Sequence, residues 1–195
     1  MRTLLRIDSS LRNEGSYSRQ YGDIFMRLWL TKYPDTKVVY RDVNQNKLPH
    51  LSRTFVNALF EGKRDALPLE VSNGICGEMK HADILLITCP TYNFGIPASL
   101  KTYFDHLVRI NETVKHDGSG GYTGLLPNKK AFLLTSMGNR KSNPEVPELF
   151  EMHLQKLLNF MGITDVRMMS VHGTALPDFM KDQEPHYIER LKQLI

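Results

Sequence analysis

The sequence predicts an α/β domain built as a doubly wound parallel sheet with helices on both faces. Short apolar segments typical of strands alternate along the chain with longer segments of helical periodicity. The strand segments are apolar on both faces, which is typical of parallel sheets whose crossover helices cover both sides. The predicted strands are residues 2–8, 37–43, 83–89, 130–136 and 166–173.

Each predicted strand is bounded by polar residues or by Gly and Pro, as in "RTLLRID", "DILLITC" and "KAFLLTS". A doubly wound sheet of five strands is typical of the flavodoxin-like fold. Three segments between the strands carry apolar residues at helical spacing. These residues are Tyr21, Ile24, Phe25 and Leu28; Leu100, Phe104, Leu107 and Val108; and Leu149, Phe150, Leu154, Leu157, Leu158 and Met161.

We expect residues 1–195 to form a single domain. A chain of 195 residues with 41% hydrophobic content lies in the ordinary range for one domain. No internal repeat, low-complexity run or linker divides it. Residues 43–67 and 111–129 are long connections for such a fold, and long connections often carry function. Residues 111–129 are expected to reach over the mouth of the functional site.

Composition argues against nucleic-acid and metal chemistry. The 25 Lys and Arg residues exceed the 21 Asp and Glu residues, which gives a formal net charge of +4, but they are scattered along the chain. Nucleic-acid binding usually needs a concentrated basic surface. A mildly basic surface instead favours small anionic ligands. The seven histidines show no metal-ligand spacing, so we expect no metal site.

The cysteines and the apolar runs indicate a cytoplasmic protein without a membrane partner. Cys76 and Cys89 have no zinc-type spacing, and both are predicted to be buried free thiols. The first residues contain too short an apolar run for a signal peptide. No segment approaches the roughly 18 apolar residues of a membrane span.

Three loops are expected to carry the function. In doubly wound sheets, ligands bind outside the carboxyl ends of the strands, at the switch point beside the first strand. These loops are residues 9–18, 90–97 and 136–144.

The first loop is rich in serine. Ser9, Ser10, Ser16 and Ser18 precede a helix that is expected to begin at Ser18. Hydroxyls and backbone N–H groups at a helix N-terminus bind phosphate, although Ser18 is also a suitable ordinary N-cap. Since the loop has neither GxGxxG nor GxxxxGK[ST], a monophosphate such as that of FMN fits it best.

The second loop, "PTYNFGIPASL", is predicted to be a stiff turn at a strand's end. Gly95 and the flanking prolines stiffen the turn, and Pro97 suits the first turn of the next helix. Tyr92 and Phe94 offer aromatic surfaces to a flat heterocycle, and Asn93 offers hydrogen bonds to its polar edge. The alternative is that both aromatic residues belong to the core and anchor the turn.

The third loop, "LLTSMGNRKSN", places Ser136, Gly138 and Asn139 at another strand's carboxyl end. Its small residues let the backbone approach the same ligand.

Together, "GSYSRQ", "PTYNFGIPASLKTYFD", "LLTSMG" and "FMGITDV" resemble the FMN-dependent NADH azoreductases and their quinone-reductase relatives over nearly the whole chain. The resemblance implies a flavodoxin-like homodimer with FMN at each subunit interface. It assigns FMN binding to Ser10, Ser16, Tyr17, Ser18, Thr91, Tyr92, Asn93, Phe94, Ser136, Met137, Gly138 and Asn139.

The chain departs from that family's pattern in ways that bear on its substrates. Thr91 stands where the family commonly has Met, and residues 136–139 read SMGN where SRGG or a similar sequence is common. The family often places an aromatic pair near residue 116, over the neighbouring subunit's flavin, and this chain has His116 there. The resemblance assigns substrate binding to His116 and Phe160.

The resulting hypothesis is an FMN-dependent NADH:quinone oxidoreductase or azoreductase. NADH and a quinone or azo compound would take turns at FMN in a two-electron, ping-pong cycle. No catalytic residue is predicted, because the flavin itself carries the chemistry.

Three alternatives remain. An electron-transfer flavoprotein would need a partner reductase, and such proteins are usually acidic. A domain without cofactor would be non-catalytic. A hydrolase would rest on the serine loop alone, because no GxSxG motif is present.

Overall fold

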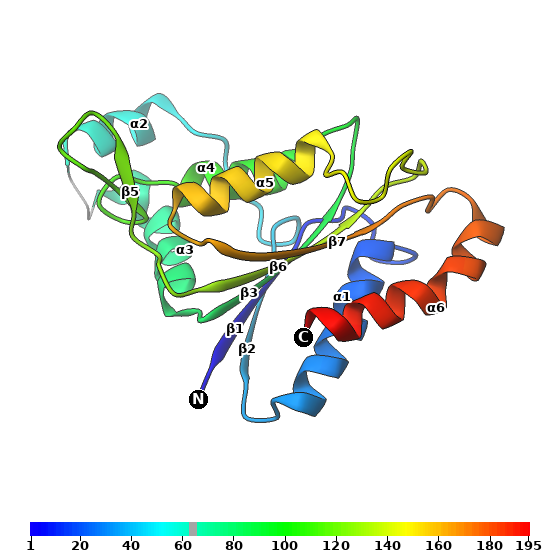
Figure 1. Cartoon of the computed structure of the whole chain (residues 1–195). Coiled ribbons are helices and arrows are strands. Elements are labelled where there is room, and N and C mark those ends of the chain that lie inside the picture. Colours follow the sequence, from blue (N-terminus) through cyan, green and yellow to red (C-terminus); the bar gives the residue numbers. More distant parts are fainter. Residues whose placement is uncertain (63–65) are drawn as a thin grey trace.

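The computed structural model describes residues 1–62 and 66–195, and its centre is a parallel sheet with helices on both faces (Figure 1). The strand order is β2-β1-β3-β6-β7. This order confirms the predicted flavodoxin-like, doubly wound arrangement. The strands are β1 (Thr3–Asp8), β2 (Lys37–Asp42), β3 (Ile84–Pro90), β6 (Lys130–Ser136) and β7 (Asp165–Val171).

The register brings the carboxyl ends of the central strands to one edge. β3 and β6 pair from Ile84 opposite Lys130 to Pro90 opposite Ser136. On the other side of β3, Asp8 at the end of β1 lies opposite Thr88. The loops that follow β1, β3 and β6 therefore start side by side, as the sequence predicts.

The helices form two layers, one on each face of the sheet (Figure 1). On one face, α1 (Tyr17–Lys32) and α6 (Pro177–Leu194) bury Phe25 and Tyr187 against Leu86. On the other face, α3 (Glu70–His81), α4 (Ala98–Leu107) and α5 (Leu149–Phe160) pack against neighbours such as Leu85. The side chains of adjacent β3 residues thus face opposite helix layers, because side chains alternate along a strand.

The periodic segments form α1, α4 and α5, with Val108 and Met161 as the C-caps of α4 and α5, but α1 begins one residue earlier than predicted. Ser16 is its N-cap, and the Ser16 hydroxyl accepts a hydrogen bond from the Arg19 N–H at 3.5 Å. Ser18 therefore lies inside the first turn and is not the cap. Two further elements lie within 43–69, namely α2 (Arg53–Phe60) and the 3₁₀ helix η1 (Leu67–Leu69).

Residues 111–129 contain a hairpin of β4 (Val114–His116) and β5 (Tyr122–Gly124). It docks on the C-terminal end of α5, where the Leu126 N–H donates to the Met161 carbonyl at 2.9 Å. The loop after β6 leads into the opposite end of this helix. Within one chain, the prediction that this segment reaches over the mouth of its own site is therefore wrong.

Both cysteines are buried and free, as predicted. Burial raises the pKa of the Cys89 thiol to about 12, which makes it a poor nucleophile. Over the described residues, the longest helices are too short or too polar to cross a bilayer.

Candidate cofactor site

A cavity of about 110 Å³ lies at the carboxyl edge of the sheet, and we call it the carboxyl-edge pocket. All three predicted loops contribute to it. Of the predicted FMN-binding residues, those that line the pocket are Ser10, Ser16, Tyr17, Thr91, Tyr92, Ser136, Met137 and Gly138. The switch point of the sheet, between β1 and β3, is therefore also the place where the candidate side chains meet.

One end of the pocket suits an anion, because it lies at the N-terminus of α1. The buried hydroxyls of Ser16, which lines the pocket, and of Ser18, which does not, are 3.2 Å apart there. Gly15 has φ +63, and a Cβ at Gly15 would lie 2.9 Å from Nη2 of Arg12. The Arg12 guanidinium thus lies beside a helix start, where the partial positive charge also attracts phosphate.

Arg12 lines the pocket but was absent from the predicted site. It is the one basic residue in the loop 9–18, and that charge is the signal that could have identified it. Ser9 behaves in the opposite way. Its hydroxyl donates to the Thr88 carbonyl at 2.8 Å, and the side chain is fully buried outside the pocket. Ser9 therefore holds the loop to β3 rather than facing a ligand.

The backbone after Ser10 is fixed from three directions. The Ser10 carbonyl accepts hydrogen bonds from Arg19 Nη2 at 2.7 Å and from Asn44 Nδ2 at 2.9 Å. The Leu11 N–H donates to the Tyr92 hydroxyl at 3.1 Å. Tyr92 thus joins the serine loop to the loop after β3.

A buried ionic network supports this wall. Asp8, at the end of β1, accepts hydrogen bonds from Arg6 Nε at 2.9 Å and from the Thr88 hydroxyl at 2.8 Å. Arg19 lies 3.4 Å from Asp8 and 2.7 Å from Asp42. The guanidinium that holds the Ser10 carbonyl is therefore itself held by two carboxylates.

The loop after β3 is a tight turn with unusual backbone angles. Tyr92 and Gly95 exchange two backbone hydrogen bonds of 3.0 Å, and the residues between them, Asn93 and Phe94, have φ values of 50° and 63°. These angles define a turn with two left-handed residues, which suits Asn but strains Phe. Such strain often marks a functional position.

Phe94 is 82% exposed, so it does not anchor the turn as a core residue. Neither Asn93 nor Phe94 is a lining residue of the pocket. Over the described residues, their backbone N–H groups make no hydrogen bond. The turn therefore leaves main-chain donors beside the pocket.

The loop after β6 also has free backbone N–H groups. The carbonyls of Met137, Gly138 and Asn139 accept hydrogen bonds from residues 173–175, at 2.8 to 3.2 Å. The N–H groups of Gly138 and Asn139 have no partner in the described part of the chain. Asn139 itself lies just outside the lining set. The free main-chain groups that this loop offers to a ligand are therefore mainly donors.

Thr174, which follows β7, is a second lining residue absent from the prediction. Its hydroxyl donates to the Met137 carbonyl at 3.1 Å. The Thr91 hydroxyl oxygen, by contrast, is buried without a partner among the described residues. Such an atom usually signals a missing polar partner.

The carboxyl-edge pocket has the groups that FMN needs. The pocket offers a cationic helix start, free backbone donors, an unpartnered hydroxyl and aromatic residues at its rim. This donor set suits a phosphate joined to a flat heterocycle that accepts hydrogen bonds.

The structure does not bring His116 and Phe160 to the pocket of the same chain. They lie around Tyr122 on the hairpin, with ring centroids 4.6 Å and 5.5 Å from the Tyr122 ring. Tyr122 and Phe160 are 46% and 38% exposed. This aromatic cluster is therefore open at the surface.

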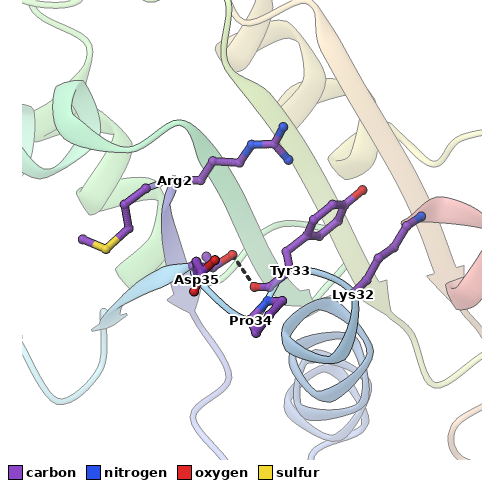
Figure 2. Close-up of a pocket in the computed structure, with 7 residues that line it drawn as sticks. Arg2, Lys32, Tyr33, Pro34 and Asp35 are labelled. Carbon is purple, nitrogen blue, oxygen red and sulfur yellow. Dashed lines mark hydrogen bonds between the residues drawn. The ribbon is translucent and has the colours of Figure 1, made fainter.

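A larger cavity of about 360 Å³ lies at the opposite, amino edge of the sheet (Figure 2). Its polar side chains mostly make contacts within the protein. Thr36 donates to the Tyr33 carbonyl, Lys32 Nζ donates to the Ile195 carbonyl oxygen at 3.0 Å, and Arg2 lies 5.3 Å from the Tyr33 ring centroid. Since ligands of doubly wound sheets bind at the carboxyl edge, the smaller pocket is the better candidate.

The chain is similar in sequence to known proteins over most of its length. A family model described as Flavodoxin-like fold matches residues 2–195. The FMN-dependent NADH:quinone oxidoreductase of Marinomonas sp. is 40% identical over 181 residues, which are 90% of each chain. The protein of that name from Hydrogenovibrio crunogenus is 36% identical over 182 residues, again 90% of each chain.

Solved structures share the fold. An azoreductase from Bacillus anthracis str. Sterne superposes with a TM-score of 0.89 at 24% identity, covering 99% of this chain and 98% of that chain. An FMN-dependent NADH-azoreductase from Bacillus anthracis str. Ames Ancestor, solved in complex with FMN, has a TM-score of 0.80 at 21% identity. It covers 98% of this chain and 99% of that chain.

Proposed function

The chain belongs to the FMN-dependent NADH:quinone oxidoreductases, which share the flavodoxin-like fold, and on this premise we propose that it reduces quinones with electrons from NADH at FMN in the carboxyl-edge pocket. Azo compounds are proposed as further acceptors. The observation that carries the proposal is the meeting of three loops whose free donors and helix start suit this cofactor.

Different residues of the pocket would bind different parts of the cofactor. Ser16, Ser18, Arg12 and the first N–H groups of α1 would hold the phosphate. The N–H groups of the turn after β3 and of the loop after β6 would hold the ring. Bound FMN supplies hydride acceptance from NADH and electron delivery to the acceptor.

The protein's own contribution to the chemistry would be electrostatic. Backbone N–H groups fixed in advance favour negative charge that develops beside them, without reorganising during the reaction. The carbonyls of residues 137–139 are bound by residues 173–175, whereas the N–H groups of Gly138 and Asn139 have no partner in the described part of the chain and would favour negative charge.

The proposal is tested by the visible spectrum of the purified protein before and after anaerobic addition of NADH. A flavin spectrum that bleaches with NADH, in the absence of acceptor, is the expected result. An electron-transfer protein that needs a reductase would hold flavin without bleaching, and a domain without cofactor would be colourless.

NADH and the acceptor are proposed to take turns, because both would have to stack on the single exposed face of the flavin ring. Double-reciprocal plots at several fixed acceptor concentrations should then be parallel. Intersecting lines would show that both substrates bind together and would contradict this ping-pong scheme.

A homodimer is proposed because the parts of the site are separated within one chain. The pocket lies beside the exposed Phe94, while the cluster of His116, Tyr122 and Phe160 lies away from this pocket in the same chain. A two-fold axis would let each copy cover the other's pocket. Sedimentation at micromolar concentration should give twice the chain mass, whereas an active monomer would refute the proposal.

The compartment is proposed to be the cytoplasm. This rests on the free, buried Cys76 and Cys89, which are compatible with a reducing environment. No partner beyond a second copy and small-molecule substrates is proposed.

A further inference from the structure

A buried ion pair lies behind the loop that follows β6. Nζ of Lys141 is 2.7 Å from the carboxylate of Glu151, and the two side chains are only 2% and 1% exposed. Lys141 belongs to the same loop as Gly138 and Asn139. Glu151 lies in the first turn of α5. The pair therefore joins the ligand-facing loop to a helix of the core.

The Glu151 carboxylate gathers donors from three elements. It accepts hydrogen bonds from the Thr135 hydroxyl on β6 at 2.5 Å, from Lys141 at 2.7 Å and from the Glu148 N–H at the start of α5 at 2.8 Å. Burial by itself would raise the pKa of Glu151, but these hydrogen bonds outweigh burial and lower it. The Glu151 carboxylate thus links β6, the loop after β6 and the start of α5 through hydrogen bonds to a single charged group.

Lys141 fixes the loop from the other end of the pair. Besides Glu151, its ammonium donates to the Val146 carbonyl at 3.3 Å, so it bridges two parts of the same loop. On the far side, the carbonyls of residues 137–139 are bound by residues 173–175. The loop is therefore held on both sides, while the N–H groups of Gly138 and Asn139 have no hydrogen-bond partner in the described part of the chain.

Stability alone is a weak reason for such a pair. Desolvating two charges costs about as much as their attraction returns, and apolar replacements of similar size are often as stable. An apolar pair, however, would not hydrogen-bond Thr135, Glu148 and Val146. What the ion pair adds over apolar packing is a fixed backbone path for this loop.

We propose that Lys141 and Glu151 are positioning residues for the cofactor: they fix the backbone of Gly138 and Asn139 so that its N–H groups donate to the polar edge of the flavin ring. This inference rests on the proposed function. It adds two residues that lie outside the lining of the pocket and that neither the sequence motifs nor the pocket itself indicate.

The test uses the full chain freed of FMN, with two measurements on each variant. FMN is titrated by quenching of its fluorescence, and stability is measured by urea unfolding without FMN. Lys141→Met should lower both stability and FMN affinity. The double variant Lys141→Met/Glu151→Leu should recover much of the stability, while its FMN dissociation constant stays raised about tenfold, the effect of losing one good hydrogen bond.

The matched control is Lys192→Met/Glu189→Leu, which removes an exposed pair at 3.2 Å on α6. It should change neither measurement. If the double variant at 141 and 151 does not fold, Lys141→Met is titrated alone under conditions where circular dichroism shows it folded, because it removes both donors of residue 141 and leaves Glu151 its bonds from Thr135 and Glu148. It should show the same rise in dissociation constant.

Parental FMN affinity in a folded variant would overturn the positioning role. If the parent protein itself bound no FMN, the proposed function would fail first, so the two failures are distinguishable.

Discussion

Replacing Arg6 by Met is expected to destabilise the protein by about 3 to 5 kcal/mol, because it leaves a buried carboxylate without its nearest cation. Arg6 is 4% exposed and contacts Asp8 at 2.9 Å, at the end of β1. Arg19, at 3.4 Å, would be the cation left beside Asp8. Urea unfolding of the protein freed of FMN measures the change.

The matched control uses the other carboxylate that Arg6 binds. Asp23 lies 2.6 Å from Arg6, but its side chain is 57% exposed, so water replaces most of the interaction. Asp23→Asn should therefore cost about 1 kcal/mol or less. Equal losses for the two variants would show that burial of Asp8 is not the cause. Arg6→Met should also weaken FMN binding, because Asp8 holds the Arg19 that holds the Ser10 carbonyl.

Gly124→Ala should cost about 3 kcal/mol, and should displace the β4–β5 hairpin, because the added methyl group meets backbone. A Cβ at Gly124 would lie 2.1 Å from the Gly162 nitrogen and 2.2 Å from the Met161 carbonyl carbon. Backbone at the end of α5 cannot move aside as a flexible side chain can. Thermal or urea unfolding measures the loss.

Gly74→Ala is the matched control for this substitution. Gly74 lies within α3, and a Cβ there would have nothing within 4 Å. Alanine in a helix interior is favoured over glycine by about 0.5 to 1 kcal/mol, so this variant should be slightly more stable than the parent. A small effect at both glycines would mean that the hairpin does not dock closely on α5.

The strands β1, β3 and β6 and the helices α1, α4 and α5 were predictable because each buries a regular apolar pattern. Helix α6 was harder to predict. Only Met180, Tyr187 and Leu191 are buried along it, and Pro185 lies inside the helix. Proline usually ends a helix. Packing against the sheet overrides that local preference here, and a single sequence does not report packing.

The location of the candidate site was predictable from the sequence, but many of its individual contacts were not. Topology alone brings the three loops together, since the carboxyl ends of parallel strands share an edge. The position of Arg12 depends on the left-handed backbone at Gly15, and the donors beside Phe94 depend on a strained turn that phenylalanine does not favour. His116 and Phe160 lie away from the pocket in one chain, so their predicted role depends on a second copy.

The main-chain donors of the pocket have a consequence for how such a protein changes under selection. A backbone N–H is present whatever side chain the residue carries, proline excepted. Substitutions at the exposed Phe94, or at Asn139 beside the pocket, can therefore alter what a substrate meets while the donors to the cofactor persist. Under the proposed function, the range of electron acceptors can therefore change through substitutions at these positions while the protein still binds its cofactor.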